Sequence, residues 1–388
     1  MKILHMISSG GMYGAEAVIL NLSHALNEGS HRSMLGVFSN SANPNLQLHE
    51  RALQEGIESY PIPCNGQIDR QAITIIRELV QRTGAEVVHA HGYKADLYAY
   101  FALRAAGVPL VSTCHNWLDN DRKAYFYGVL DRLILRRYAR VVAVSEDIRQ
   151  RLVKAGTRAE KIRIIRNGID LRPFDHASGV VKDELDWSAF PLVGLVGRLS
   201  VEKGVDIFLR AAARVVAQVP DAKFIVVGDG PDRAKLEALI DEVGIRGSAV
   251  MLGRRNDMPS VFASLDVMVS ASRQEGLPIV ILEGMASRLP LIATPVGEVP
   301  TVIQDGRTGV LVPAEEPELL ASAIIDLLRD NAKRERLGVA ARRLVEKDFS
   351  AERMTADYLR VYEDAVTAAA GDNDEQLGSS VPLRGKAK

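Results

Sequence analysis

Two cations and two carboxylates stand in short segments whose residue types suit a charged ligand. Arg198 and Lys203 follow an apolar run and lie five residues apart within 197–204, a segment with a glycine at each end. A guanidinium and an ammonium at this spacing suit a diphosphate. Glu275 and Glu283 lie eight residues apart, and the second has apolar neighbours, so its carboxylate needs a polar partner such as a sugar hydroxyl. A solvated loop and a helix-capping glutamate beside a surface glutamate are the plainer interpretations.

A third segment, near the start of the chain, is rich in glycine. Gly10, Gly11 and Gly14 follow the first apolar run and precede a helical pattern. Glycine lets the backbone approach a ligand closely, and a helix N-terminus favours an anionic group. The spacing differs from the dinucleotide-binding pattern GxGxxG, and a plain tight turn is the alternative.

The elements that would position these segments follow a repeated order of strand, loop and helix. Short apolar runs are typical of parallel strands buried on both faces, and their alternation with helical segments predicts doubly wound α/β domains. The pattern restarts near residue 192, after a turn-rich stretch at 167–173. Strands are expected at 3–7, 33–37, 86–90, 109–113, 140–144, 192–196, 223–227, 249–252, 267–270, 291–294 and 308–311.

This pattern predicts an α/β fold with two Rossmann-like domains, at 1–170 and 171–350. Residues 351–370 are expected to form a C-terminal helix. The last segment, 371–388, is predicted to be a disordered tail because its residues cannot bury an apolar face.

The composition narrows the class of protein. With 388 residues the chain exceeds one ordinary core, and its 47% hydrophobic and 25% charged residues exclude a disordered chain. A net charge of −1 argues against a nucleic-acid partner. Two cysteines suit a reducing compartment, and no apolar run approaches the roughly 18 residues that span a bilayer. We therefore expect a cytoplasmic protein.

Taken together, the chain resembles the retaining glycosyltransferases of family 4, which have the GT-B fold of two Rossmann-like domains facing across a cleft. The resemblance runs from about residue 1 to about residue 370. It rests on four motifs in family order, which are the glycine loop at 10–16, Asn-Gly-Ile-Asp at 167–170, the segment 197–204 and the E-x7-E pair at 275 and 283. Gly-Asp-Gly-Pro at 228–231, Leu-Gly at 252–253 and Pro-Val-Gly at 295–297 add to it.

The resemblance implies roles for individual residues. Arg198 and Lys203 would bind the donor diphosphate and stabilise the leaving nucleotide. Glu275 would meet the donor sugar, Glu283 the ribose hydroxyls, and His115 would contact the donor sugar across the cleft. The four that would act in the reaction itself are His115, Arg198, Lys203 and Glu275. The other donor-binding positions that it implies are Gly11, Gly14, Gly228, Arg254, Gly276, Leu277 and Ile279.

The activity implied is retaining transfer of a sugar from a UDP- or GDP-sugar to a saccharide or lipid-linked acceptor, in bacterial polysaccharide or glycoconjugate synthesis. The helix at 351–370 would cross back to the first domain. Because two cations carry the diphosphate charge and no Asp-x-Asp pair follows a strand, we expect no metal and no cofactor. A nucleotide-sugar epimerase and a non-catalytic nucleotide-sugar-binding module remain alternatives.

Two histidines and one helix need separate interpretations. His89 and His91 lie two apart at a strand end, and without a third ligand nearby we expect them to line the cleft or bond loop backbone. Residues 122–140 form a basic, aromatic-rich helical pattern typical of interfacial helices. This predicts peripheral contact with the inner face of the plasma membrane, and the alternative is a helix packed on its own domain with a solvated basic face.

Overall fold

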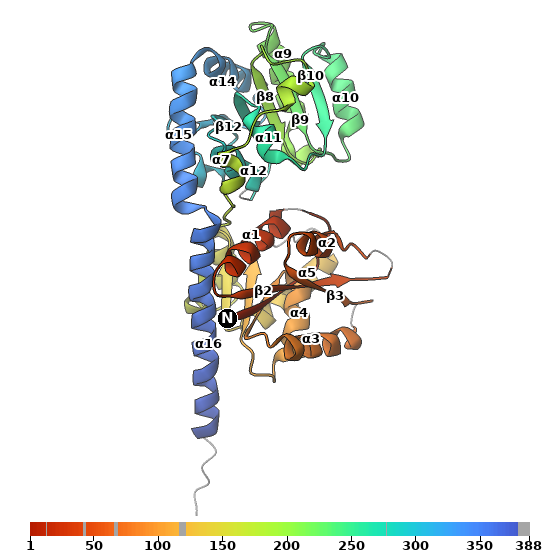
Figure 1. Cartoon of the computed structure of the whole chain (residues 1–388), viewed down its shortest axis with the longest axis vertical. Coiled ribbons are helices and arrows are strands. Elements are labelled where there is room, and N and C mark those ends of the chain that lie inside the picture. The colour runs from red at the N-terminus through yellow and green to blue at the C-terminus, as the bar shows by residue number, and fades with distance from the viewer. Residues whose placement is uncertain (13, 42–43, 66–68, 116–121, 277, 379–388) are drawn as a thin grey trace, which may run out of the picture. The chain divides into compact units, whose positions relative to one another are not determined.

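The computed structural model describes residues 1–388 except 13, 42–43, 66–68, 116–121, 277 and 379–388. The chain divides into two compact units, each with a sheet flanked by helices (Figure 1). Unit 1 contains Met1–Asn167 and Ala351–Lys388, and unit 2 contains Gly168–Ser350. The division at 167 and 168 falls three residues before the predicted boundary at 170 and 171.

The sheet of unit 1 has seven parallel strands in the order β3-β2-β1-β4-β5-β6-β7. Its strands are β1 (Lys2–Ile7), β2 (Arg32–Ser39), β3 (Glu58–Pro63), β4 (Val87–His91), β5 (Leu110–Cys114), β6 (Arg140–Ala143) and β7 (Ile162–Ile164). Its helices are α1 (Gly14–Glu28), α2 (Gln47–Gln54), α3 (Arg70–Thr83), α4 (Tyr93–Leu103), α5 (Arg122–Leu135), α6 (Glu146–Lys154), the 3-10 turn η1 (Ala159–Lys161) and α16 (Ala351–Gly378).

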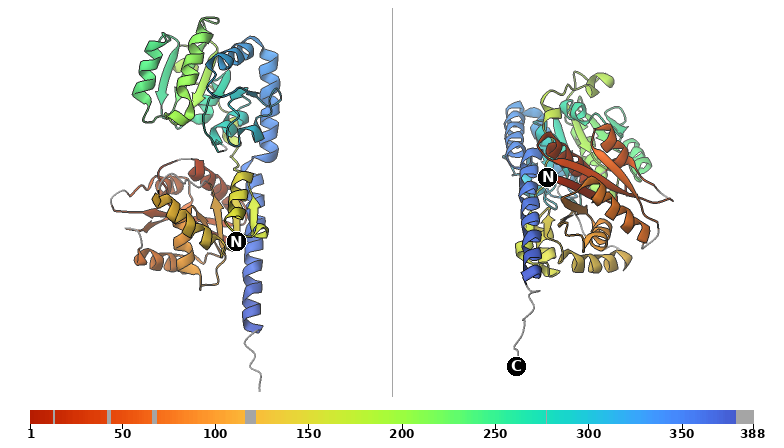
Figure 2. Two further views of the ribbon diagram at one scale, coloured as in Figure 1. Left: turned by 180° about the vertical axis from the view of Figure 1, so that it is seen from behind. Right: turned by 60° about the horizontal axis from the view of Figure 1, so that its bottom comes forward.

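The two faces of this sheet differ in chemistry because neighbouring strand residues point to opposite sides. Leu4, Met6 and Val88 lie in an apolar core on one face. His5 and His89 occupy the other face, where α16 contacts β4, β5 and β6. Figure 2 shows α16 running along this unit.

The sheet of unit 2 has six parallel strands in the order β10-β9-β8-β11-β12-β13. Phe224 and Val226 belong to the core on one face, and Ile225 and Val227 to the core on the other. Its strands are β8 (Leu192–Val196), β9 (Lys223–Val227), β10 (Ala249–Gly253), β11 (Val267–Ser270), β12 (Leu291–Ala293) and β13 (Val310–Leu311). Its helices are α7 (Arg172–Asp175), α8 (Val181–Glu184), the 3-10 turn η2 (Val201–Lys203), α9 (Val205–Val216), α10 (Arg233–Glu242), α11 (Met258–Ala263), α12 (Ile279–Ala286), α13 (Val299–Val302), α14 (Pro317–Arg329) and α15 (Asn331–Asp348).

The structure corrects two predictions at helix ends. Residues 371–378 were expected in the disordered tail, but α16 continues to Gly378, because a helix that is already formed gains one hydrogen bond for each residue added. The expected helix at 122–140 ends at Leu135. Tyr138 is buried and donates a hydrogen bond to the Asp96 carbonyl oxygen at 2.8 Å, and Arg140 begins β6. No helix in the described part of the chain is long and apolar enough to cross a membrane.

Candidate functional site

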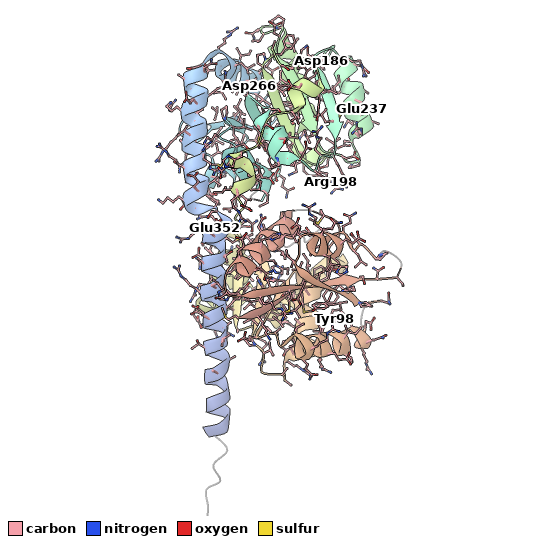
Figure 3. All side chains as sticks on the ribbon, viewed as in Figure 1. Tyr98, Asp186, Arg198, Glu237, Asp266 and Glu352 are labelled. Atoms are coloured by element: carbon pink, nitrogen blue, oxygen red, sulfur yellow. The ribbon has the colours of Figure 1, made fainter. Side chains whose placement is uncertain are left out.

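Four strands of unit 2 are followed by loops that contain residues singled out in the sequence. Arg198 follows β8, Gly228 follows β9, Arg254 follows β10 and Glu275 follows β11. Because the paired strands are parallel, these loops lie at one edge of the sheet, the edge at which open α/β sheets bind ligands. Arg198 and Arg254 are exposed to solvent, and Figure 3 shows Arg198 at the margin of the unit.

Lys203 and Glu275 form an ion pair at this edge. The Lys203 Nζ donates to the Glu275 Oε1 at 2.6 Å, and the Ser272 Oγ donates to the same oxygen at 2.7 Å. The Glu275 side chain is 8% exposed, whereas 26% of the Lys203 side chain remains open to solvent. An ammonium carries three donors, so Lys203 keeps donors for a phosphate while one is held by Glu275.

A second ion pair joins the first turn of α9, directly after the loop that carries Lys203, to the loop that carries Glu275. The Arg273 guanidinium donates to both carboxylate oxygens of Asp206 at 2.8 Å. The backbone N–H of Arg273 donates to the Glu202 carbonyl oxygen at 2.7 Å. Paired hydrogen bonds of this kind fix orientation as well as distance. The loop after β8 is therefore held against the loop after β11 before any ligand binds.

Two glycines make this close approach possible. Gly204 has φ +61°, and a Cβ there would lie 1.9 Å from the Ala271 carbonyl oxygen. Gly297 has φ +56°, and a Cβ there would lie 1.9 Å from the Glu275 carbonyl oxygen. Both positions require a residue without a side chain, since such contacts cannot be relieved by rotating a side chain.

Glu283 lies within α12, which follows the Glu275 loop. Burial raises the pKa of its carboxyl to about 7. At pH 7 this carboxyl is therefore about half ionised. Its ionised form is suited to accept hydrogen bonds from a ligand, because these replace the hydrogen bonds from water that burial removes. A polar partner for this carboxylate stays a prediction.

Four further residues of unit 2 were predicted to bind the donor. Gly276 is exposed and Ile279, the first residue of α12, is half-buried. Gly228 packs on the backbone of the β8 loop, since a Cβ there would lie 1.9 Å from the Gly197 carbonyl oxygen. Leu277 lies outside the described residues.

Unit 1 holds the other three predicted residues. Gly11 is buried in the loop after β1, which the Ser9 hydroxyl braces at 2.8 Å from both the Gly11 carbonyl oxygen and Glu16 Oε1. Gly14 begins α1 and is exposed. His115 follows β5, and its Nε2 lies 3.2 Å from His91 Nδ1. Burial lowers the pKa of His115 to about 4, so the imidazole is neutral at pH 7.

The expectation for His89 and His91 is wrong. Both side chains are buried, that of His89 against Tyr358 and Tyr362 of α16 and that of His91 between His5 and His115. His89 Nδ1 lies 2.8 Å from the Tyr362 hydroxyl and its Nε2 lies 2.7 Å from Thr113 Oγ1, so its partners are side chains and not loop backbone. A nearby third histidine, His5, also went unnoticed. Its ring comes from β1, more than eighty residues away in the sequence, and only strand pairing places it beside them.

Sequence reasoning missed three supporting residues in unit 2. These are Ser272, Arg273 and Asp206, which hold Glu275 and the loop after β8. Ser272 and Arg273 stand inside the motif that contains Glu275, so position in the motif was an available signal. The pairing of Arg273 with Asp206 spans 67 residues and has no local signal.

Comparisons with known proteins agree with this arrangement. Residues 190–330 match the model of glycosyl transferases group 1, and residues 12–172 match glycosyltransferase family 4. Alpha-D-kanosaminyltransferase of Streptomyces kanamyceticus is 31% identical over 293 residues, which are 71% of this chain and 76% of that protein. N-acetyl-alpha-D-glucosaminyl L-malate synthase of Bacillus anthracis is 28% identical over 84% of this chain and 86% of its own length. The crystal structure of Anabaena HepE with UDP has a TM-score of 0.82 at 22% identity and covers 94% of this chain and 100% of HepE.

The two parallel, Rossmann-like sheets have the GT-B fold, and the family matches identify the chain as a glycosyltransferase. The chain belongs to glycosyltransferase family 4 and is an enzyme that acts on nucleotide sugars.

Proposed function

We propose that this enzyme transfers a sugar from a UDP- or GDP-sugar to a saccharide or lipid-linked acceptor with retention of the anomeric configuration, in polysaccharide or glycoconjugate synthesis. The observation that carries the proposal is the Lys203–Glu275 pair beside exposed Arg198, at the strand edge of unit 2. The presence of UDP in the HepE structure supports a uridine nucleotide. The family resemblance supports retention.

The reaction exchanges one bond at the anomeric carbon for another. The bond from this carbon to the β-phosphate oxygen breaks with its electron pair on that oxygen, and the acceptor hydroxyl forms the new bond on the same face. The acceptor proton passes to the departing phosphate oxygen. Arg198 and Lys203 stabilise the negative charge that develops on the departing phosphate oxygen, as a divalent metal does in other transferases.

The other residues position the donor. Glu275 accepts hydrogen bonds from the transferred sugar, and the backbone N–H groups of Gly276 and Ile279 bind the sugar and phosphate. Glu283 accepts hydrogen bonds from the ribose, Arg254 lies beside the base, and Gly11 and Gly14 leave room for the phosphates. His115, neutral at pH 7, donates a hydrogen bond to the sugar.

The test is the configuration of the product. The enzyme is incubated in EDTA with UDP-glucose, GDP-mannose and their common relatives together with simple glycoside acceptors, and the new anomeric proton is followed by NMR from the first minutes. The proposal expects an α-linked product from an α-linked donor. An inverted product contradicts retention, and interconversion of the donor sugar without any acceptor identifies an epimerase.

The raised pKa of the Glu283 carboxyl leads us to expect that protons are released when the donor nucleotide binds. Its carboxyl is mostly protonated at pH 6 because its pKa in the free protein is about 7, and ribose hydroxyls that donate to it favour the ionised form. Binding of UDP-glucose, whose diphosphate diester does not titrate between pH 6 and 8, should therefore release up to about 0.9 proton at pH 6 and at most about 0.1 at pH 8. Calorimetry in buffers of different ionisation enthalpy measures this number. Glu283→Gln should abolish the release at pH 6, and the absence of any release in the wild-type protein would rule out ribose binding at Glu283.

We also propose that α5 makes peripheral contact with an anionic membrane. Val129 and Leu133 lie four residues apart, on one side of this helix, and are 38% and 51% exposed. Arg137 is exposed two residues beyond the helix end, and Arg136 donates to the Ala155 carbonyl oxygen at 2.6 Å, which anchors the helix end to unit 1. An apolar strip bordered by cations is typical of helices that lie in a membrane interface.

Leu133→Asp should lower binding to anionic vesicles at low salt about tenfold, since it removes the burial of one leucine. Sedimentation with vesicles of phosphatidylglycerol and phosphatidylcholine measures the bound fraction. Leu319→Asp is the matched control, because Leu319 is 48% exposed on α14 of unit 2. A wild-type protein that stays in the supernatant at low salt excludes the membrane contact.

A further inference from the structure

Three histidines of unit 1 form a continuous line of imidazole rings that ends at His115. His5 Nδ1 lies 3.1 Å from His91 Nε2, and His91 Nδ1 lies 3.2 Å from His115 Nε2. His5 is 0% exposed and His91 is 5% exposed, whereas His115 is partly exposed. Both distances are those of hydrogen bonds between ring nitrogens.

The line is a consequence of strand register. β1 pairs with β4 so that His5 stands opposite His89 and Ile7 opposite His91. β4 pairs with β5 so that His91 stands opposite Thr113, two residues before His115. Side chains two residues apart share a face, so all these rings come to the face that α16 covers.

A neutral imidazole has one N–H and one bare nitrogen, so the whole line must run in one direction. In one direction His5 Nδ1–H donates to His91, and His91 Nδ1–H donates to His115 Nε2. In the other direction His115 Nε2–H donates to His91, and His91 Nε2–H donates to His5. The proton of His115 therefore lies on Nδ1 in the first case and on Nε2 in the second.

The surroundings of His5, at the buried end of the line, favour one of these two directions. His5 Nε2 is buried and has no hydrogen-bond partner among the described residues. In the second direction this nitrogen would carry a buried, unpaired N–H, which is rarer in proteins than an unpaired acceptor. The first direction leaves only a bare lone pair there. Burial also lowers the pKa of His5 to about 3 and that of His115 to about 4, so the rings at both ends of the line are neutral at pH 7.

We propose that His91, whose Nδ1–H donates to His115 Nε2, is a positioning residue that holds His115 in the Nδ1–H tautomer, so that His115 presents a neutral N–H donor to an oxygen of the donor sugar. The sugar contact rests on the function proposed above, but the tautomer does not. His89 stands outside the line, because its two nitrogens face Thr113 and Tyr362. The same engagement argues against a metal ion shared by His5, His89 and His91, whose nearest ring nitrogens lie within 4.8 Å of one another.

The experiment reads the tautomer directly. The full chain is labelled with ¹⁵N-histidine, and long-range ¹H–¹⁵N correlation at pH 7 and pH 5.5 identifies the protonated nitrogen of each ring. His115→Gln assigns the signal. We expect His115 as the neutral Nδ1–H form at both pH values. An Nε2–H form, or an imidazolium at pH 5.5, overturns the proposal whatever the enzyme's substrate is.

Two variants at position 91 separate direction from packing. His91→Phe removes the donor to His115 Nε2, and His115 should then also populate the Nε2–H form, whereas His91→Asn keeps a donor near the Nδ1 position and should preserve the Nδ1–H form. His24→Phe is the control, because His24 lies outside the line and contacts Glu55. An unchanged His115 tautomer in folded His91→Phe overturns the proposal. If that variant does not fold, the wild-type and His91→Asn spectra decide.

Two further readouts complete the test. For transfer, kcat/KM should fall about tenfold in His91→Phe, the free energy of about one hydrogen bond, and should recover in His91→Asn, while the affinity for UDP alone stays unchanged. Elemental analysis of the protein as isolated provides the other readout. A stoichiometric metal that is lost in His91→Phe overturns the proposal in favour of a metal site.

Discussion

Lys203→Ala is expected to lower kcat/KM for sugar transfer by about 10² to 10³, the effect of removing one preorganised donor from a developing oxyanion. Lys203 is held at 2.6 Å from Glu275, so its ammonium already stands at the strand edge before the donor binds. Most of the loss should appear in kcat, since the charge on the departing phosphate is greatest in the transition state. Steady-state kinetics with the donor sugar identified by the product assay measures the effect.

The matched control is Lys182→Ala in the same unit. Lys182 Nζ donates to Asp266 at 2.8 Å, and its side chain is 23% exposed, close to the 26% of Lys203. Asp266 precedes β11 and Arg198 follows β8, so this control lies at the opposite end of the sheet, as Figure 3 shows. The control should keep activity within about twofold, because this partly buried ion pair lies far from the site. Lys203→Ala activity within about threefold of wild type would refute the role of Lys203.

Gly297→Ala is expected to lower kcat/KM by about 10², because displacements near 1 Å at a site cost about that much. A Cβ at this position would lie 1.9 Å from the Glu275 carbonyl oxygen and 3.0 Å from that of Gly276. The loop must move, and it carries Glu275 away from Lys203 and Ser272. The affinity for UDP-sugar, measured by calorimetry, should fall together with the rate.

Gly306→Ala separates this clash from backbone strain. Gly306 also has positive φ, +70°, but a Cβ there would meet nothing within 4 Å. Both variants pay for the left-handed conformation, about 1–2 kcal/mol of folding stability, and only Gly297→Ala disturbs the site. Equal kinetics in the two variants would mean that Gly297 does not support the Glu275 loop.

The strands that carry the site were predictable because their pattern is local. β8, β9 and β11 occur at the predicted residues, since parallel strands buried on both faces read as unbroken apolar runs bounded by loops. β3 was missed because Pro61 and Pro63 argue against a strand. It lies at the edge of the sheet, where only one side of its backbone is paired and proline is tolerated.

The contacts within the site depended on topology instead. The sequence singles out Lys203 and Glu275 separately, but the ion pair between them spans 72 residues and follows from the adjacency of β8 and β11. The same holds for the line from His5 to His115, which needs three strands in register. The desolvation of Glu283 was predictable from the apolar composition of α12, because a helix this apolar packs against the core on most of its surface.

The most direct test of the account is calorimetric binding of UDP, GDP and ADP in EDTA to the wild-type protein, Lys203→Ala and Lys182→Ala. The account predicts that one nucleoside diphosphate binds the wild type without metal, that Lys182→Ala binds it equally well, and that Lys203→Ala binds it at least tenfold more weakly, the worth of a charge-assisted hydrogen bond. Binding that appears only when Mg²⁺ or Mn²⁺ is added, or that is unchanged in Lys203→Ala, would contradict it.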